Sequence, residues 1–446
     1  MLVLVFGGIL LFLGTGVGLA IWCFSGTSEA LAPREAEGTA ESQPPSRQEP
    51  APPNKPEAKE VPLVALPPED QEKVNQAIDR GVEYLKKSQD PRTGAWPGGR
   101  VGYTALPGLT LLECGVPAQD PAVQKAAGHV RSQLTGLTAT YDLALAILFL
   151  DRLEDPQDKE RIWTLALRLV AGQDTAGGWT YDCPVLTPRQ QQQLVSVLQA
   201  NVPPSPLALG PVAFDKLGPA GADALEPAVK NLPVLQPPAG AMRGPRHRII
   251  SDNSNTQFAI LGLWAARRHG VPLQRTLALI VRRFRNSQNA DGAWGYRLWT
   301  EWRPSMTCAG LLGMAVGLGL TNEANKMGNK PAEDPTQDPA VQKAVGYLAN
   351  HVGNPTGRWQ GLQLANLYFL WSLERVAVIF RLPKIGEKEW YPWGAEMLVA
   401  NQQPAGNWQG GGYPGATPLS DTCLALLFLR RANLAKDLTD KLRVGD

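Results

Sequence analysis

Residues 173–179 read Gln-Asp-Thr-Ala-Gly-Gly-Trp, and the same Gln-x3-Gly-x-Trp pattern returns at residues 288–294 and 402–408. Glycine readily adopts the left-handed conformation of a tight turn, and tryptophan can cover the end of a helical hairpin. A Gln side chain can bond backbone groups that a helix terminus leaves unpaired. The pattern therefore predicts a repeated structural turn. Its Gln and Trp residues, with one copy that carries an extra residue, are Gln89, Trp96, Gln173, Trp179, Gln288, Trp294, Gln402 and Trp408.

Helical periodicity surrounds these turns. An amphipathic segment precedes each turn, and a nearly all-apolar segment follows it. A helix that is apolar on all sides is normally buried, so an inner ring of apolar helices inside an outer ring of amphipathic helices satisfies both patterns. We therefore expect an all-α fold of about six helical hairpins. The apolar segments are Thr104–Glu113, Leu143–Leu153, Phe258–Ala266, Cys308–Leu318, Leu362–Phe380 and Leu419–Leu429.

A longer repeat marks two helix starts. The eight residues from Gln119 to Ala126 recur identically from Gln337 to Ala344, and each copy contains Asp-Pro. Aspartate caps free backbone N–H groups, and proline suits the first helical turn because its missing N–H would be unpaired there anyway. This repeat indicates that one helical unit is used several times.

The turn pattern resembles the motif of squalene and oxidosqualene cyclases, and related helical hairpins build the β subunits of protein prenyltransferases. The resemblance extends over about residues 69–438, with three full motifs, one with an insertion and one partial copy at Gly357-Arg358-Trp359. It implies an α/α toroid with inner and outer helix rings. It does not imply one activity, because a fold does not determine function.

The catalytic groups of those families are incomplete here. The resemblance would lead us to expect the Asp-x-Asp-Asp acid of squalene–hopene cyclases, which is absent from the chain; the nearest acidic cluster is residues 151–155. Asp421-Thr422-Cys423 matches the Asp-x-Cys half of the prenyltransferase zinc site, but none of the four histidines opens an inner helix, and zinc needs a complete ligand set. We therefore expect no cyclase or zinc prenyltransferase chemistry, no metal and no cofactor.

Polar residues gather where the apolar helices begin. Two interpretations are open: a polar ring at the mouth of an apolar cavity, or hydrogen-bonded helix caps and helix–helix packing. In either interpretation the candidate residues are Asp142, Asp252, Gln257, Cys308, Asp421 and Cys423.

The N-terminal region predicts attachment to a membrane. Residues 1–24 are almost wholly apolar and carry no charge, and this stretch is long enough for one membrane-spanning helix. A cleaved signal peptide is the alternative, with a small-residue site at residues 30–32. Residues 25–68 are rich in proline and should form a disordered linker. We expect a single-pass membrane protein whose toroid domain, residues 69–446, lies outside the cytoplasm.

One hairpin carries an insertion at about residues 183–250, which could be a lid or a disordered excursion. The expected function is binding of a hydrophobic, isoprenoid-like small molecule; the alternatives are a non-catalytic protein-interaction scaffold and a divergent terpenoid- or carbohydrate-active enzyme. With 43 Lys and Arg against 41 Asp and Glu, we expect no nucleic-acid partner. The sequence identifies no protein partner.

Overall fold

The computed structural model describes residues 64–205, 209–239, 250–298, 300, 303–353 and 366–443. These residues form sixteen α-helices and five short 3-10 helices, with isolated bridges as their only β pairing. The predicted all-α class is confirmed for this part of the chain. The predicted membrane helix, most of the linker and the partial motif copy at residues 357–359 lie outside the described residues.

Six helices are buried on nearly every side, and we call them the core helices. Their apolar composition leaves no face that water could solvate favourably. Each predicted apolar segment coincides with one of them, apart from residues 362–365, which are not described. The core helices are α2 (Gly102–Glu113), α4 (Thr140–Leu153), α9 (Asn253–Ala266), α11 (Pro304–Met327), α13 (Leu367–Ile379) and α15 (Pro418–Arg430).

Six further helices expose one face, and we call them the cover helices. Asp120 and Asp338 cap two of them, each accepting a backbone N–H beyond the following proline, as the Asp-Pro repeat predicts. The cover helices are α1 (Pro68–Ser88), α3 (Pro121–Ser132), α5 (Lys159–Gly172), α10 (Gln274–Ser287), α12 (Pro339–Ala349) and α14 (Trp390–Ala400).

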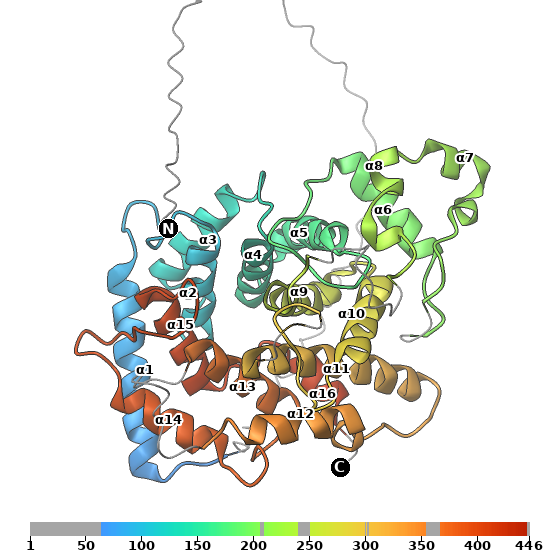
Figure 1. Ribbon diagram of the computed structural model, residues 1–446. Helices are drawn as coiled ribbons and strands as arrows, with labels where there is room; N and C mark the ends of the chain where they lie inside the picture. The colour runs from blue at the N-terminus through green and yellow to red at the C-terminus, as the bar shows by residue number, and fades with distance from the viewer. Residues whose placement is uncertain are drawn as a thin grey trace, which may run out of the picture. The chain divides into compact units, whose positions relative to one another are not determined.

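The core helices contact one another in chain order. Helix α2 packs on α4, α4 on α9, α9 on α11, α11 on α13 and α13 on α15. Helix α15 also packs on α2, so the described contacts form a closed cycle. Figure 1 shows α15, in red, beside α2 and the blue cover helix α1.

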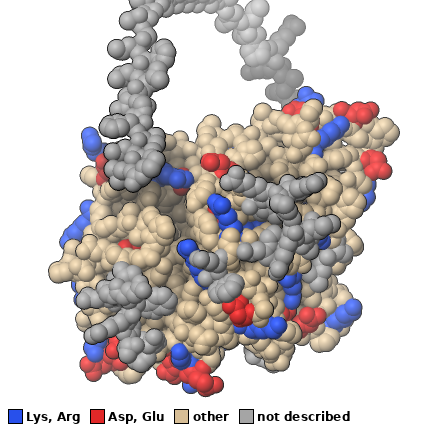
Figure 2. All heavy atoms as spheres, in the orientation of Figure 1, with Lys and Arg blue, Asp and Glu red and all other residues tan. Residues whose placement is uncertain are grey.

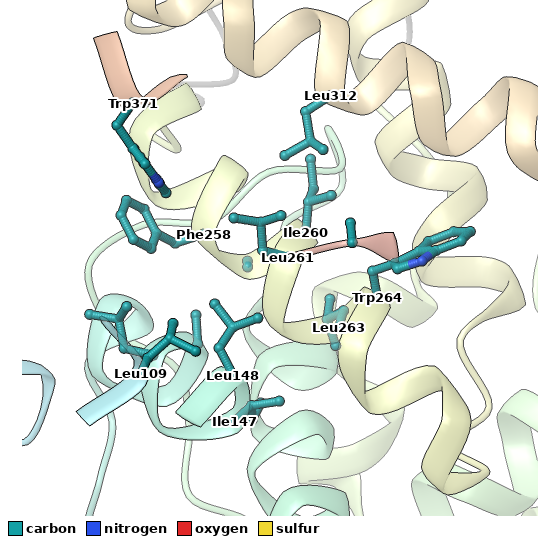
Figure 3. Close-up of a cluster of buried hydrophobic side chains, with 14 of the residues drawn as sticks. Leu109, Ile147, Leu148, Phe258, Ile260, Leu261, Leu263, Trp264, Leu312 and Trp371 are labelled. Atoms are coloured by element: carbon teal, nitrogen blue, oxygen red, sulfur yellow. The ribbon is translucent and has the colours of Figure 1, made fainter. Parts of the chain in front are cut away.

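Apolar side chains fill the interior between the core helices (Figure 3). Phe258 and Leu261 project from α9, Leu148 from α4 and Trp371 from α13, and each is at most 7% exposed. The rings of Phe258 and Trp371 are stacked with their centroids 5.1 Å apart. Burying such side chains stabilises the fold by about 25 cal/mol per Å² of apolar surface. The interior is therefore a hydrophobic core along these faces.

The glycine of each turn motif allows two hairpins to approach closely. All four motif glycines have a positive φ, between +73° and +92°. A Cβ atom on any of them would lie 2.2–2.5 Å from a backbone carbonyl oxygen of the next cover helix. Glycine is required for both reasons, because it lacks a Cβ and tolerates this φ. The glycines and the carbonyls that they face are Gly94 and Lys125, Gly177 and Leu279, Gly292 and Lys343, and Gly406 and Arg80.

The motif glutamines connect neighbouring hairpins. Each side-chain amide donates to the carbonyl of its own motif glycine and to a carbonyl of the next cover helix, at 2.8–3.3 Å. The fourth link joins Gln402 to Ala77 of α1, which connects the last hairpin to the first. The partners in the next cover helix are Ala122 for Gln89, Thr276 for Gln173, Ala340 for Gln288 and Ala77 for Gln402.

The motif tryptophans fasten each turn to its own two helices. Every indole N–H donates to a carbonyl of the preceding cover helix at 2.7–3.0 Å. Every tryptophan backbone N–H donates to a threonine hydroxyl of the following core helix at 3.1–3.3 Å. The structural role predicted for the motif is thus visible in its contacts. The indole acceptors are Leu85, Leu169, Phe284 and Leu398.

Part of the insertion is helical and packed. Helices α6 (Pro188–Ala200), α7 (Gly218–Ala224) and α8 (Pro227–Lys230) lie within it. The buried side chain of Arg275, on α10, donates to three backbone carbonyls of the insertion: Val234 at 2.7 Å, Gly210 at 3.0 Å and Gln236 at 3.0 Å. The described part of the insertion is therefore an ordered extension fixed to a cover helix.

Helix α11 is long and apolar enough to cross a membrane, and among the described residues it alone passes that test. Most of it is buried in the protein, so we interpret it as a core helix. Lys and Arg are interspersed with Asp and Glu on the face shown in Figure 2.

Candidate functional site

Three core helices bring hydroxyl groups together near their N-terminal ends. Tyr141, on α4, donates to the hydroxyl of Ser254, on α9, at 2.7 Å. The hydroxyls of Ser254 and Tyr368, on α13, share a hydrogen bond of 2.6 Å. Burial raises the pKa of the Tyr368 hydroxyl to about 12, so this group stays protonated at neutral pH.

An amide and a guanidinium extend this network. The Gln257 amide donates to the Tyr368 hydroxyl, and Arg375 donates from Nη2 to Gln257 Oε1. We call these five residues, Tyr141, Ser254, Gln257, Tyr368 and Arg375, the tyrosine network. Gln257, one of the predicted candidate residues, bonds both Tyr368 and Arg375 and so lies at the centre of the network.

Arg375 is a buried cation. It is 1% exposed, and its guanidinium carbon lies 4.2 Å from the centroid of the Trp371 ring. Its Nε and Nη1 atoms have no hydrogen-bond acceptor in the described structure, and burial lowers its pKa. A buried charge without a partner is costly, and the ring face and Gln257 offset part of that cost.

A pocket of about 430 Å³ lies beside the network, at the start of α15. The ring of Tyr413, which lines it, lies 5.6 Å from the ring of Tyr368, centroid to centroid. The Tyr413 hydroxyl donates to Ser420 at 3.0 Å, which fixes its ring. The lining residues are Gly410, Gly411, Gly412, Tyr413, Pro414, Ala416, Thr417, Pro418 and Asp421.

Asp421 is the acidic group of this pocket. It is 1% exposed, and its Oδ2 atom accepts the Gly411 N–H at 2.9 Å. Its Oδ1 atom has no donor in the described structure. Burial raises the pKa of this carboxyl, while the nearby Tyr413 hydroxyl and the Gly411 N–H act in the opposite direction. Asp421 is therefore a predicted site residue that lies at the pocket with its carboxylate covered by protein.

The other two predicted carboxylates are bonded within the protein. Asp142 pairs with Arg100 at 3.2 Å and accepts the Gly102 N–H at 3.2 Å. Asp252 caps α9 by accepting the backbone N–H of Asn255 at 2.7 Å and its side-chain amide at 2.9 Å. These contacts agree with the capping and packing interpretation at both positions.

The two predicted cysteines are buried. Burial raises the pKa of the Cys308 thiol to about 12 and raises that of Cys423 further. Thiolates are the reactive and metal-binding form, and burial disfavours that form at both side chains. The described residues contain no group of three His, Cys, Asp or Glu arranged to hold a metal ion.

Sequence reasoning did not select Tyr368 or Arg375. A usable signal was present, because the pair Glu374-Arg375 interrupts the otherwise apolar helix α13. A charged pair within a buried helix marks a place where the interior must accommodate polar atoms.

Glu374 gives the fold a predicted pH dependence. It is fully buried, both its carboxylate oxygens lack partners among the described residues, and burial raises its pKa well above the usual 4.5. The folded state therefore holds a proton that the unfolded state releases, so stability should fall as pH rises above about 4.5. Glu374→Gln should reduce this fall, measured by urea unfolding between pH 4 and 8. The exposed Glu396→Gln should not, and an unchanged slope in Glu374→Gln would contradict the assignment.

A scan of protein-family models finds none that matches this chain, and a search of curated proteins finds no relative. The similarity to the squalene cyclase and prenyltransferase repeat family remains a prediction carried by the motif residues.

Proposed function

We propose that this chain is a non-catalytic binding module, built as an α/α toroid and carried on an N-terminal membrane anchor. The closed cycle of core helices, each of which contacts at least one cover helix, supports the toroid. The link from Gln402 to α1 supports closure of both rings, because an open array would leave its two end hairpins apart.

We propose that the ligand binds at the edge of the ring, in the pocket that Tyr413 and Asp421 line. The observation that carries this choice is the contrast between the two regions. Side chains such as Phe258 and Trp371 occupy the interior, whereas the pocket has a volume of about 430 Å³. Small-molecule sites are typically concave, with a few polar groups placed to orient the ligand.

Several observations support binding without catalysis. Asp142 and Asp252 are engaged in an ion pair and a helix cap, and the Cys308 and Cys423 thiols are buried in their protonated form. Proton-initiated cyclisation needs a positioned strong acid, and Asp421 has the raised pKa of a weaker one. We expect the full-length protein to give no product from squalene or prenyl diphosphates and to retain no stoichiometric zinc. One zinc per chain that is lost in Cys423→Ala would contradict this.

The membrane anchor can be tested separately. Proteolysis within residues 25–63 should release a folded, soluble body from membranes, because the first described helix begins only at Pro68. Aggregation of the released body, or its retention on the membrane, would contradict the proposed tether.

A pocket-filling variant tests the proposed binding site. Ala416 lines the pocket and is partly exposed, so Ala416→Trp should occupy the space with little strain elsewhere. Ligand-observed NMR of a small-molecule library with the full-length protein should give binders that Ala416→Trp abolishes. Met327→Trp, at a position 78% exposed, is the control. Binders insensitive to Ala416→Trp, or no binders at all, would overturn the assignment.

A further inference from the structure

We propose that the ligand of this chain is a proline-rich segment of a partner protein, bound as an extended polyproline II helix along a row of tyrosines. This proposal rests on the proposed binding function and specifies its ligand. The row consists of Tyr181, Tyr141, Tyr368 and Tyr413, and we call it the aromatic row. It leads from an exposed end at Tyr181 to the pocket that Tyr413 lines.

The rings of the aromatic row adjoin one another although they come from four separate segments. The ring centroids of Tyr181 and Tyr141 are 6.3 Å apart, and those of Tyr368 and Tyr413 are 5.6 Å apart. Between the two pairs, the Ser254 hydroxyl bonds both Tyr141 and Tyr368, at 2.7 Å and 2.6 Å. The four rings therefore form one continuous surface where core helices begin.

The Tyr181 end of the row is open to solvent. Tyr181 is 54% exposed, and the other three tyrosines are partly exposed. An antiparallel bridge between Asp252 and Trp179 brings Ile250, which is 52% exposed, to the segment that carries Tyr181. Adjoining apolar side chains that remain in contact with water are typical of an interaction site, whereas scattered ones are not.

The charges at this end favour an uncharged partner. Exposed Asp182 follows Tyr181 directly. Exposed Arg297 follows Tyr296, whose hydroxyl bonds that of Tyr181 at 2.9 Å. These two flanking charges are opposite in sign, and the tyrosines between them carry none. Nucleic acids and anionic lipids attach through basic surfaces, which this arrangement does not provide.

Hydrogen bonding at the centre of the row favours an acceptor from the ligand. Tyr141 donates to Ser254, and the Gln257 amide donates to Tyr368. The bond between Ser254 and Tyr368 then uses one of the two hydrogens that these hydroxyls carry. One O–H hydrogen is left without an acceptor in the described structure. A backbone carbonyl of a ligand would supply one.

A polyproline II helix fits the row in bonding and in spacing. Its carbonyls make no internal hydrogen bonds, and proline brings no N–H that would need an acceptor. Alternate residues lie about 6 Å apart along this helix, close to the two ring separations of 6.3 Å and 5.6 Å. Aromatic-lined surfaces are a recurrent docking site for such segments. A sugar could also stack on these rings, but each of its hydroxyls adds a donor.

Fluorescence anisotropy with the full-length protein tests the proposal. The probe is a labelled nonapeptide in which Ala-Pro-Pro is repeated three times, and the control probe is its all-D enantiomer, which has the same composition and the opposite helical hand. The L peptide should bind at least about tenfold more tightly than its enantiomer. Tyr181→Ser should weaken the L peptide by about tenfold, because it removes the exposed ring. Val202→Ser, at a position 51% exposed outside the row, should leave its affinity unchanged.

Three results would overturn the proposal. They are equal binding of the two enantiomers, normal binding of the L peptide by Tyr181→Ser, and binding of cellopentaose that Tyr181→Ser abolishes. The last result would assign the aromatic row to a carbohydrate. Ala416→Trp should also weaken the L peptide, because it fills the pocket at the end of the row. If Ala416→Trp abolishes small-molecule binding while the L peptide fails to bind the unmodified protein, the proposed function stands and this ligand does not.

Discussion

Gly406→Ala is expected to destabilise the folded protein by about 4 kcal/mol. Its φ of +92° strains any residue with a Cβ, at a cost of about 1–3 kcal/mol. The new Cβ would also lie 2.4 Å from the carbonyl oxygen of Arg80, which is backbone and cannot rotate away. Relief of such an overpacked contact costs a further 1–3 kcal/mol or so. Urea unfolding monitored by tryptophan fluorescence measures the loss, because the adjacent Trp408 is buried.

Gly270→Ala separates the two contributions. Gly270 has a similar φ of +83°, but a Cβ there would meet nothing within 4 Å. Its substitution should therefore cost only the backbone strain, about 1–3 kcal/mol. If the two variants lost equal stability, the close approach of the last turn to α1 would not be the reason for glycine at position 406.

Arg275→Met is expected to detach the insertion from α10 while the rest of the protein stays folded. The substitution leaves the carbonyls of Val234, Gly210 and Gln236 without their donor, and each unsatisfied buried group costs about 1–3 kcal/mol. Local opening should become far more populated, so limited proteolysis within residues 209–239 should accelerate by at least about tenfold.

Arg189→Met provides the comparison within the same insertion. Arg189 is 69% exposed, and its ion pair with Glu226 spans 3.4 Å. Exposed ion pairs contribute little, typically about 0–1 kcal/mol, so this variant should be cleaved at nearly the original rate. Rapid cleavage of both variants, or of neither, would show that Arg275 is not the principal attachment.

The local parts of the fold could be predicted because their causes lie close together in the sequence. The Gly and Trp of a motif determine a turn within seven residues, and Asp-Pro determines a helix start within two. The second partner of each motif glutamine could not be predicted. For Gln402 that partner is Ala77, which depends on how the whole chain returns to its first helix.

The candidate site was predictable only in part for a similar reason. Gln257 and Asp421 were selected because polar residues opening apolar helices are conspicuous. Whether such a residue is a cap, an ion pair or a pocket group depends on what faces it. Arg100 faces Asp142, and a pocket lies beside Asp421, although both carboxylates lie in the first turn of their helices.

Helix α1 packs against α15, which comes near the end of the chain. The Gln402 side chain, in the turn before α15, also bonds Ala77 of α1, although the two residues are 325 positions apart. During synthesis, α1 therefore emerges from the ribosome long before the helices that complete its burial. At a translation rate of about 5–20 residues per second, roughly half a minute separates the synthesis of α1 from that of the last hairpin. Over that interval the apolar stripe of Val74, Ile78 and Leu85 lacks its contacts with α15 and α14. The nascent chain should thus depend on a chaperone until its last hairpin has been translated.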